Sequence, residues 1–264
     1  MRLVVNSLAV NDFGAKENTP IIFVHGFPYD HTMWLNQINE FSEEYRCIAY
    51  DIRGLGDSYV GDGQYTMEAF VYDLYSIIYQ MRLNKPILCG LSMGGYIALR
   101  AVEKEPGLFR GLILCDTKAD ADDDAGKLKR AAAIDKINVE GLGAFIDEFV
   151  PNCFSDISID EMPELYASVL EKSKRHNPTG VKGALFAMLS RTDTNSSLSK
   201  IDIPTLVLAG SLDKLTPPAK MKEMADQIKD SEFGIAPRAG HMSPLENPDF
   251  VNDMIKGFLK RRIG

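Results

Sequence analysis

Short apolar runs, each closed by Gly, His or Asp, alternate with amphipathic stretches over the first 116 residues. The apolar runs lie at residues 21–26, 47–51, 85–90 and 111–116, and helical patterns fit residues 30–42, 66–82 and 93–105. Near-continuous apolar strands separated by helices are typical of a parallel sheet that is covered on both faces. Residues 3–12 alternate between apolar and polar side chains instead, which predicts an initial antiparallel hairpin.

The strand pattern stops after residue 118 and returns after residue 199. Residues 119–199 show helical patterns separated by Gly, Pro and Asn, and an insertion of this length is too long for a structureless loop. The pattern then predicts strands at 203–210 and 231–236 and helices at 217–228 and 247–261. We therefore expect an α/β core made of residues 1–118 and 200–264, with a helical cap, residues 119–199, inserted between them.

Composition and charge narrow the classes of function. The chain has 264 residues, and its hydrophobic fraction of 45% suffices for a large buried core. A formal net charge of −8 argues against a nucleic-acid partner, because such proteins need cationic surfaces to neutralise phosphates. The sequence has no apolar run of membrane-spanning length, and polar Asn6 and Ser7 interrupt the N-terminal segment where a signal peptide needs an apolar run. We expect a cytoplasmic protein without a membrane partner.

The cysteines and histidines give no metal-binding pattern. Three of the four cysteines, Cys47, Cys89 and Cys115, lie in or beside apolar runs, which favours small core residues over a disulfide set. The four histidines show neither H-E-x-x-H nor another ligand spacing. We expect no metal and no other cofactor.

The segment Gly90-Leu91-Ser92-Met93-Gly94-Gly95 follows one predicted strand directly and precedes a predicted helix. G-x-S-x-G in this context is typical of a nucleophile elbow, in which glycines allow the sharp turn that exposes the serine Oγ. A dinucleotide-binding G-x-G-x-x-G would need Gly at position 92, and a P-loop would need Lys at position 96, which is Tyr. The alternative interpretation is a structural turn that contains an incidental serine.

A serine hydroxyl needs a base, and His241 is the candidate. Gly240 and Pro244 place His241 in a turn between the last predicted strand and the final helix, at the sheet edge that Ser92 also occupies. The alternative is an ordinary surface-loop histidine. The carboxylate that would orient the imidazole is Asp213, which follows a predicted strand and precedes a Pro pair, or Asp116, which closes the strand at 111–116. We favour Asp213.

The loop after the first parallel strand, His25-Gly26-Phe27-Pro28, is the candidate for oxyanion binding. A tetrahedral intermediate needs two donors, one from the residue after the nucleophile and one from such a loop, so we expect the N–H groups of Met93 and Phe27. Pro28 has no N–H to donate. We expect His25 to hold the loop by hydrogen bonds.

The segment 51–58 closes another strand and receives no chemical role. We expect Asp51 to form an ion pair with Arg53 or to accept turn hydrogen bonds there.

Taken together, these motifs resemble the α/β-hydrolase superfamily. The match rests on five segments in order: HGFP (25–28), DIRGLGDS (51–58), GLSMGG (90–95), LAGSLDKLTPP (208–218) and AGHMSPLENP (239–248). Among its branches the chain is most similar to small esterases, to cofactor-free haloperoxidase or perhydrolase-like arylesterases, and to enol-lactone hydrolases. HGFP is also similar to epoxide hydrolases and haloalkane dehalogenases, but those branches carry Asp at the elbow, where this chain has Ser92.

This resemblance implies an α/β-hydrolase fold with a mostly parallel eight-stranded sheet. It also implies Ser92, Asp213 and His241 as the catalytic triad and Phe27 and Met93 as oxyanion donors. The chain order Ser, acid, His is that of the family, although Asp116 would satisfy the same order.

We therefore predict a serine hydrolase that cleaves a small or medium uncharged ester or lactone through an acyl-enzyme on Ser92. Apolar walls for the substrate are expected from Trp34, Phe145, Phe149, Phe186, Met188 and Leu215. Two alternatives remain: a slow or non-catalytic ligand sensor on the same scaffold, and acyl transfer to peroxide instead of water.

Overall fold

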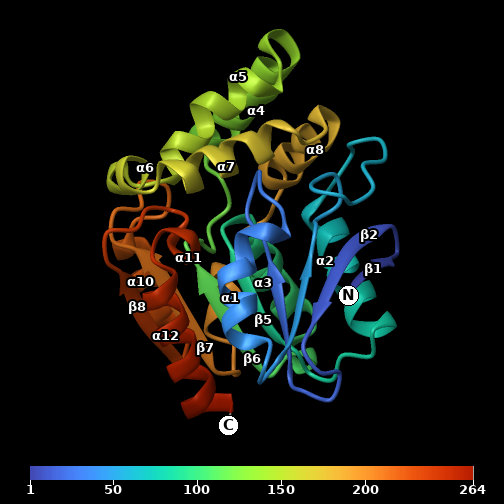
Figure 1. The fold of residues 1–264 in the computed structure, drawn as a ribbon, viewed down its shortest axis with the longest axis vertical. Coiled ribbons are helices and arrows are strands. Elements are labelled where there is room, and N and C mark those ends of the chain that lie inside the picture. The colour runs from blue at the N-terminus through green and yellow to red at the C-terminus, as the bar shows by residue number, and fades with distance from the viewer. Residues whose placement is uncertain (264) are drawn as a thin grey trace.

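The computed structural model describes residues 1–263, and an eight-stranded sheet runs through the whole of the core (Figure 1). The strands are β1 (Arg2–Val5), β2 (Leu8–Phe13), β3 (Pro20–Val24), β4 (Arg46–Tyr50), β5 (Ile87–Leu91), β6 (Gly111–Cys115), β7 (Thr205–Gly210) and β8 (Ser231–Ala236). Their order in the sheet is β1-β2-β4-β3-β5-β6-β7-β8. β1 and β2 form the expected antiparallel hairpin, β2 pairs antiparallel with β4, and the pairs from β4 to β8 are parallel. The predicted fold class is confirmed.

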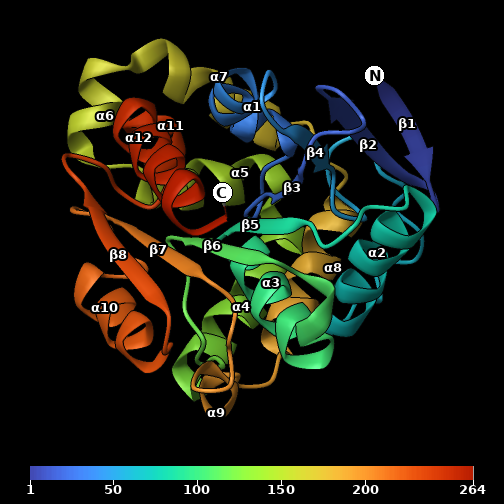
Figure 2. The same cartoon turned by 90° about the horizontal axis from the view of Figure 1, so that it is seen from below.

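The parallel strands are buried because helices cover both faces of the sheet. Every residue of β3, β4, β5, β6 and β7 is buried, which explains why these strands read as continuous apolar runs. Figure 2 shows α1, α11 and α12 on one face and α2, α3 and α10 on the other. These helices are α1 (Leu35–Phe41), α2 (Met67–Gln80), α3 (Met93–Lys104), α10 (Pro218–Gln227), α11 (Ser243–Glu246) and α12 (Pro248–Phe258).

Two predicted helices differ from the structure at their ends. The helix expected at 30–42 begins as a 3-10 turn, η1 (His31–Trp34), because Asp30 accepts the Thr32 N–H at 2.8 Å and Trp34 leaves helical geometry before α1. The helix expected at 247–261 ends as α12 at Phe258 and continues as a π-turn, η4 (Leu259–Ile263). A further 3-10 turn, η2 (Pro106–Leu108), follows α3.

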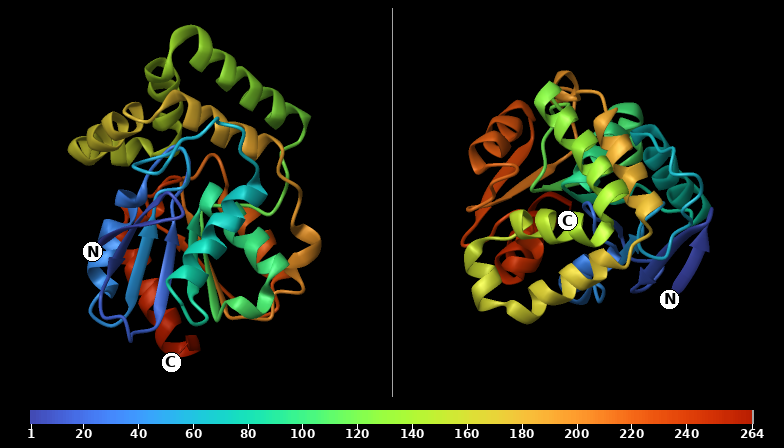
Figure 3. Two further views of the ribbon diagram at one scale, coloured as in Figure 1. Left: turned by 90° about the vertical axis from the view of Figure 1, so that its right-hand side faces the viewer. Right: turned by 90° about the horizontal axis from the view of Figure 1, so that it is seen from above.

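The inserted region is helical, as predicted, and lies between β6 and β7. It contains α4 (Asp124–Glu140), α5 (Leu142–Phe149), η3 (Val150–Cys153), α6 (Asp156–Glu161), α7 (Pro163–Lys174), α8 (Pro178–Leu189) and α9 (Asn195–Leu198). Figure 3 shows the longer of these helices lying across one end of the sheet. The cap covers the end of the sheet at which the parallel strands have their carboxyl termini. A contact that shows this joins Arg238, in the loop after β8, to Glu161 of α6 at 2.7 Å. That residues 119–199 form a unit separate from the core stays a prediction.

The four cysteines are buried and carry free thiols. Cys47, Cys89 and Cys115 lie in β4, β5 and β6, which agrees with their predicted place in the core, and Cys153 ends η3. Within residues 1–263, none of the helices is both long and apolar enough to cross a membrane.

The two segments that lead into and out of the cap lie side by side. The Thr194 N–H donates to the Ala119 carbonyl oxygen at 3.0 Å, and the Arg191 guanidinium donates to the Asp120 carbonyl oxygen at 2.6 Å. The segments through which the chain enters and leaves the cap are therefore joined to each other by hydrogen bonds.

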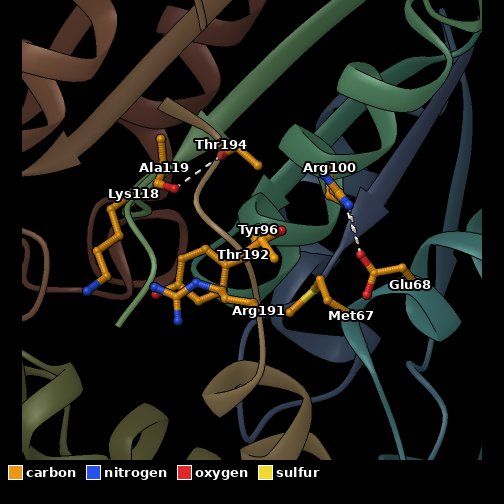
Figure 4. A pocket seen from close by; sticks show the side chains of 9 residues that line it. All are labelled: Met67, Glu68, Tyr96, Arg100, Lys118, Ala119, Arg191, Thr192 and Thr194. Carbon is orange, nitrogen blue, oxygen red and sulfur yellow. Dashed lines mark hydrogen bonds and ion pairs between the residues drawn. The ribbon is translucent and has the colours of Figure 1, made fainter. Parts of the chain in front are cut away.

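A buried carboxylate, Asp122, organises this junction. It pairs with Arg130 and, at 3.0 Å, with Arg191, whose guanidinium lies 4.0 Å from the ring centroid of Tyr96 (Figure 4). Burial opposes the charge of Asp122, but the hydrogen bond and charge of Arg130 and the charge of Arg191 lower its pKa to about 2. The Arg191 side chain is only 3% exposed, so the ion pair with Asp122 compensates a guanidinium that is largely removed from water.

The turn from β5 into α3 is held by close backbone packing. Ser92 lies at the turn with φ 53° and ψ −114°, a conformation that L-residues rarely adopt. A Cβ on Gly94 would lie 2.1 Å from the Val24 carbonyl oxygen, and one on Gly90 would lie 2.4 Å from the Gly94 carbonyl oxygen. Glycine is needed at positions 90 and 94, because neighbouring backbone atoms occupy the space that a side chain would take.

Gly94→Ala is expected to lower the free energy of unfolding by about 3 kcal/mol, because the new methyl group forces α3 away from β3. Gly107→Ala is the matched control, since a Cβ there meets nothing within 4 Å. Denaturant unfolding measures both variants. Equal stability of the two would contradict the close packing of α3 on β3.

Asp122→Asn is expected to destabilise the protein by about 2–4 kcal/mol at neutral pH, because it removes the partner of a buried guanidinium. The pKa of Asp122 is lower in the folded state, at about 2, than its ordinary 3.8, so the stabilisation is present above the ordinary value. It is lost as the pH falls through about 2, and the difference between wild type and variant should shrink over that range. Thermal or denaturant unfolding at several pH values measures this difference. Asp124→Asn is the control, because this side chain, two residues further along at the start of α4, is 99% exposed.

Candidate active site

Ser92 stands at the turn between β5 and α3, partly exposed at the carboxyl end of the sheet. Its N–H donates to the Cys115 carbonyl oxygen at 3.0 Å, and the Thr117 hydroxyl donates to the Ser92 carbonyl oxygen at 2.8 Å. Both bonds tie the elbow to the end of β6. The Ser92 hydroxyl is therefore held in a fixed position at the start of a helix.

His241 lies in the loop between β8 and α11, and the structure brings it to Ser92. Its Nε2 is 2.8 Å from Ser92 Oγ, and its Nδ1 is 2.8 Å from Asp213 Oδ2. The His241 N–H donates to the Cys153 carbonyl oxygen at 2.8 Å, which fixes the loop against η3. The three side chains form one continuous chain of hydrogen bonds although β6 and the whole cap separate Ser92 from Asp213 in sequence.

Asp213 follows β7, and its carboxylate is held in place by hydrogen bonds that it accepts from its own loop. Its Oδ1 accepts the N–H groups of Leu215 at 2.7 Å and Thr216 at 3.0 Å, and its Oδ2 accepts the Thr216 hydroxyl at 2.6 Å. Burial opposes its charge, but the charge of His241 and these hydrogen bonds lower the pKa of Asp213. An ionised carboxylate accepts the proton on His241 Nδ1, so Nε2 is left free to accept the Ser92 proton.

The imidazole of His241 is buried, with 4% of the residue exposed. Burial lowers its pKa, but the charge and the hydrogen bond of Asp213 outweigh burial and raise the pKa above the ordinary 6.5. Charges of Asp116 and Glu246 act in the same direction. The site therefore favours a positively charged ring more than water does.

Asp116, the rival carboxylate, lies at the end of β6 and bonds elsewhere. Its Oδ1 accepts the Gly210 N–H at 2.7 Å, and its Oδ2 accepts the Ser243 N–H at 3.2 Å and the Ser243 hydroxyl. The His241 ring is bonded to Asp213 instead. Burial and the charge of Asp213 raise the pKa of Asp116 well above its ordinary value.

The two expected oxyanion donors are backbone groups beside Ser92. Met93 is the first residue of α3, so its N–H has no acceptor within the helix. Gly26, next to Phe27, is close to the elbow, since a Cβ on it would lie 3.4 Å from Ser92 Cβ. Within residues 1–263, the Phe27 N–H has no protein acceptor.

His25 holds this loop in the way the sequence indicates. Its Nε2 accepts the Ile52 N–H at 2.9 Å, so the ring is protonated on Nδ1, which is 2.8 Å from the Gly26 carbonyl oxygen. Burial lowers the pKa of His25. The ring thus links the loops that follow β3 and β4.

The expected ion pair between Asp51 and Arg53 is wrong. Arg53 makes a two-bond pair with Asp73 of α2, and Asp51 bonds to His31 Nδ1 at 2.7 Å. The alternative of turn bonds is correct, since Asp51 Oδ2 accepts the Asp57 N–H at 2.9 Å. Neighbours in sequence are separated here because their side chains leave the loop in different directions.

Asp51 also belongs to a polar cluster that sequence patterns did not indicate. Asp30, His31 and Asp51 each have one side-chain atom that could bind a metal ion, and these three atoms lie within 4.8 Å of one another. These groups already bond to one another and to the backbone, as in the His31–Asp51 pair.

The side chains expected to line a pocket divide into three groups. Phe145 and Phe149 of the cap stack on each other at 5.4 Å between ring centroids and pack on Phe27 at 6.1 and 5.5 Å. Trp34 is fully buried against Phe23 in the core instead. The remaining three are Met188, which is buried in α8, and Phe186 and Leu215, which are 49% and 41% exposed.

A second carboxylate near His241, Glu246, was missed by sequence reasoning. Its Oε1 accepts the N–H groups of Gly240 at 2.9 Å and Met242 at 3.0 Å, on either side of His241, and its Oε2 accepts the Ser155 N–H at 2.8 Å. A carboxylate five residues after a histidine is not distinctive in sequence. Only the fold shows that it joins the His241 loop to the cap.

The chain is similar to several known proteins over nearly its whole length. A thermophilic esterase from Thermogutta terrifontis, solved with malate bound, is 36% identical with a TM-score of 0.94 over 99% of this chain and 98% of that one. 3-Oxoadipate enol-lactonase 1 from Acinetobacter baylyi is 29% identical over 96% of this chain and 93% of its own. An AB hydrolase superfamily protein from Bacillus subtilis is 30% identical over 96% and 95%.

The family model described as alpha/beta hydrolase fold matches residues 19–248, a range that includes Ser92, Asp213 and His241. This match confirms the resemblance seen in the sequence motifs, and the chain belongs to the alpha/beta hydrolase fold family.

Proposed function

We propose that the protein is a serine hydrolase that cleaves small or medium uncharged carboxylic esters or lactones. The observation that carries the proposal is the hydrogen-bond chain from Ser92 Oγ through His241 to Asp213, with both links at 2.8 Å. This arrangement activates a serine for attack on a carbonyl carbon. An esterase and an enol-lactonase among the similar proteins support the same class of reaction.

The acylation step follows from the positions of these groups. His241 Nε2 takes the Ser92 proton while Oγ forms a bond to the carbonyl carbon, and the carbonyl π electrons move to its oxygen. The N–H groups of Phe27 and Met93 face that oxyanion. When the tetrahedral intermediate collapses, the bond to the alkoxy oxygen breaks, and His241 gives its proton to the leaving alcohol. Asp213 stabilises the imidazolium between the two proton transfers.

Deacylation repeats the sequence with water as the nucleophile. His241 removes a proton from the water, the hydroxide oxygen bonds to the acyl carbon, and the Ser92 Oγ leaves and recovers its proton. The carboxylic acid is then released. The protons balance between the side chains of this chain, the ester and one water molecule.

The aromatic rings of Phe27, Phe145 and Phe149 support an uncharged substrate. They form one cluster between the oxyanion loop and α5, and a charged acyl group beside it would lose hydration without gaining a partner. We therefore place the acyl or ring portion of the substrate against this cluster. A lactone fits the same mechanism, because its leaving alcohol simply stays attached to the acyl group.

Ser92→Ala is expected to abolish both multiple turnover of p-nitrophenyl acetate and labelling by a fluorophosphonate probe, because the nucleophile is removed. Peptide mapping of the labelled wild type should identify Ser92. Ser196→Ala, an exposed serine of α9, is the control and should keep both activities. Labelling at another residue, or a wild type that binds ester without multiple turnover, would refute the proposal, and the second result would indicate a ligand sensor.

Turnover is expected to fall as the pH decreases through the pKa of His241, because the protonated ring cannot accept the Ser92 proton. Since Asp213 raises that pKa above 6.5, the acidic limb of kcat/KM should lie above 6.5. Asp213→Asn should move the limb to lower pH and reduce kcat by about 10⁴-fold. Asp156→Asn, 84% exposed on the cap, should leave the profile unchanged. An acidic limb that Asp213→Asn does not shift would contradict the assignment.

A further inference from the structure

Asp116 is a completely buried carboxylate to which the mechanism above gives no role. It follows β6 directly, has φ 45°, and donates its own N–H to the Leu208 carbonyl oxygen of β7 at 2.9 Å. A positive φ is uncommon outside Gly, although Asn, Asp and His adopt it more often than other residues. The side chain is thereby placed among the loops at the carboxyl end of the sheet.

The two oxygens of Asp116 bond at the edges of two different loops, to the last residue of β7 and to the first residue of α11. Oδ1 accepts the Gly210 N–H at 2.7 Å, three residues before Asp213. Oδ2 accepts the Ser243 N–H at 3.2 Å and the Ser243 hydroxyl, two residues after His241. One carboxylate thus spans the loop that carries the acid and the loop that carries the base.

These two loops also touch each other directly. A Cβ on Gly210 would lie 1.9 Å from the Gly240 carbonyl oxygen, and the Leu212 N–H donates to the Ala239 carbonyl oxygen at 2.8 Å. A shift of one loop must therefore move the other. Asp116 is attached to both at the point where they meet.

We propose that Asp116 is a positioning residue, whose carboxylate holds the acid loop and the histidine loop in the relative position that closes the Ser92–His241–Asp213 chain. The inference rests on the proposed function, because that chain is its object. Asp116 touches neither the His241 ring nor Ser92 by a hydrogen bond and acts through Gly210 and Ser243.

The charge of Asp116 has a second effect on the same site. Three carboxylates, Asp213, Asp116 and Glu246, act on the His241 ring, and each raises its pKa. The groups that act on Asp116 are Asp213 and His241, and the buried Cys115 thiol lies next to it in the chain. Because burial raises the pKa of Asp116 itself, removal of its charge should lower the pKa of His241 over the pH range in which Asp116 is ionised, while a purely structural role would leave that pKa unchanged.

Asparagine cannot replace this carboxylate, although it has the same shape. All three partners of Asp116 are donors, and an asparagine amide presents one oxygen and one NH₂ group. Its NH₂ group would face the N–H of either Gly210 or Ser243, because only the Ser243 hydroxyl can rotate to accept. One loop would lose its acceptor and move.

The experiment compares Asp116→Asn with wild type on p-nitrophenyl acetate. We expect kcat to fall by about 10- to 100-fold with KM changed by less than about threefold, since displaced groups slow the chemical step more than binding. The acidic limb of kcat/KM should move to lower pH. Ser243→Ala, which removes only the hydroxyl donor, should give a smaller loss of kcat and serves as the second variant if Asp116→Asn does not fold.

The pKa of His241, followed by NMR titration of the ring, provides a readout that does not depend on turnover. It should be lower in Asp116→Asn than in wild type. Unchanged kcat and His241 pKa would overturn the inference, and so would a loss of kcat that only tracks the fraction of unfolded protein. A loss as large as that of Asp213→Asn would also overturn it, because Asp116 would then act as the acid itself.

Failure of the proposed function is recognised separately. If the fluorophosphonate probe does not label Ser92 in wild type, the nucleophile assignment is wrong whatever Asp116 does. If Ser92 is labelled and Asp116→Asn behaves like wild type in turnover and in the NMR titration, only the positioning role fails.

Discussion

Buried carboxylates that accept backbone N–H groups hold the loops at the carboxyl end of the sheet. Residues in these loops leave the strand ladder, so their N–H groups need other acceptors. Asp213 accepts those of Leu215 and Thr216, Asp116 accepts that of Gly210, and Glu246 accepts those on either side of His241. Hydrogen bonds to an ionised acceptor such as Asp213 are stronger than neutral ones, so few contacts fix the loop that carries it.

The same carboxylates set the electrostatics of the proposed reaction. A neutral imidazole in an apolar pocket would resist protonation, and burial alone does lower the pKa of His241. The surrounding negative charge reverses this direction and favours the imidazolium that each proton transfer produces. The groups that shape the loops thus also stabilise the charge that develops in them.

Local patterns in the sequence predicted the strands, the inserted helices and Ser92, because each depends on neighbours in the chain. Apolar runs mark strands that are buried on both faces, and Gly94 marks a helix that packs on β3 backbone. The roles of Asp116 and Glu246, the pairing of Arg53 with Asp73, and the burial of Trp34 depend on segments far apart in sequence. A single sequence carries no pattern that relates such segments.

The hydrogen bond between Thr194 and Ala119 joins the two ends of the insertion at 3.0 Å. A segment whose ends are already together can be exchanged for one of another length without stretching the scaffold beneath it. Because β6 and β7 pair directly below this point, such an exchange leaves their register intact. The insertion is thereby free to vary in length, except where Cys153 and Ser155 contact the segment that carries His241.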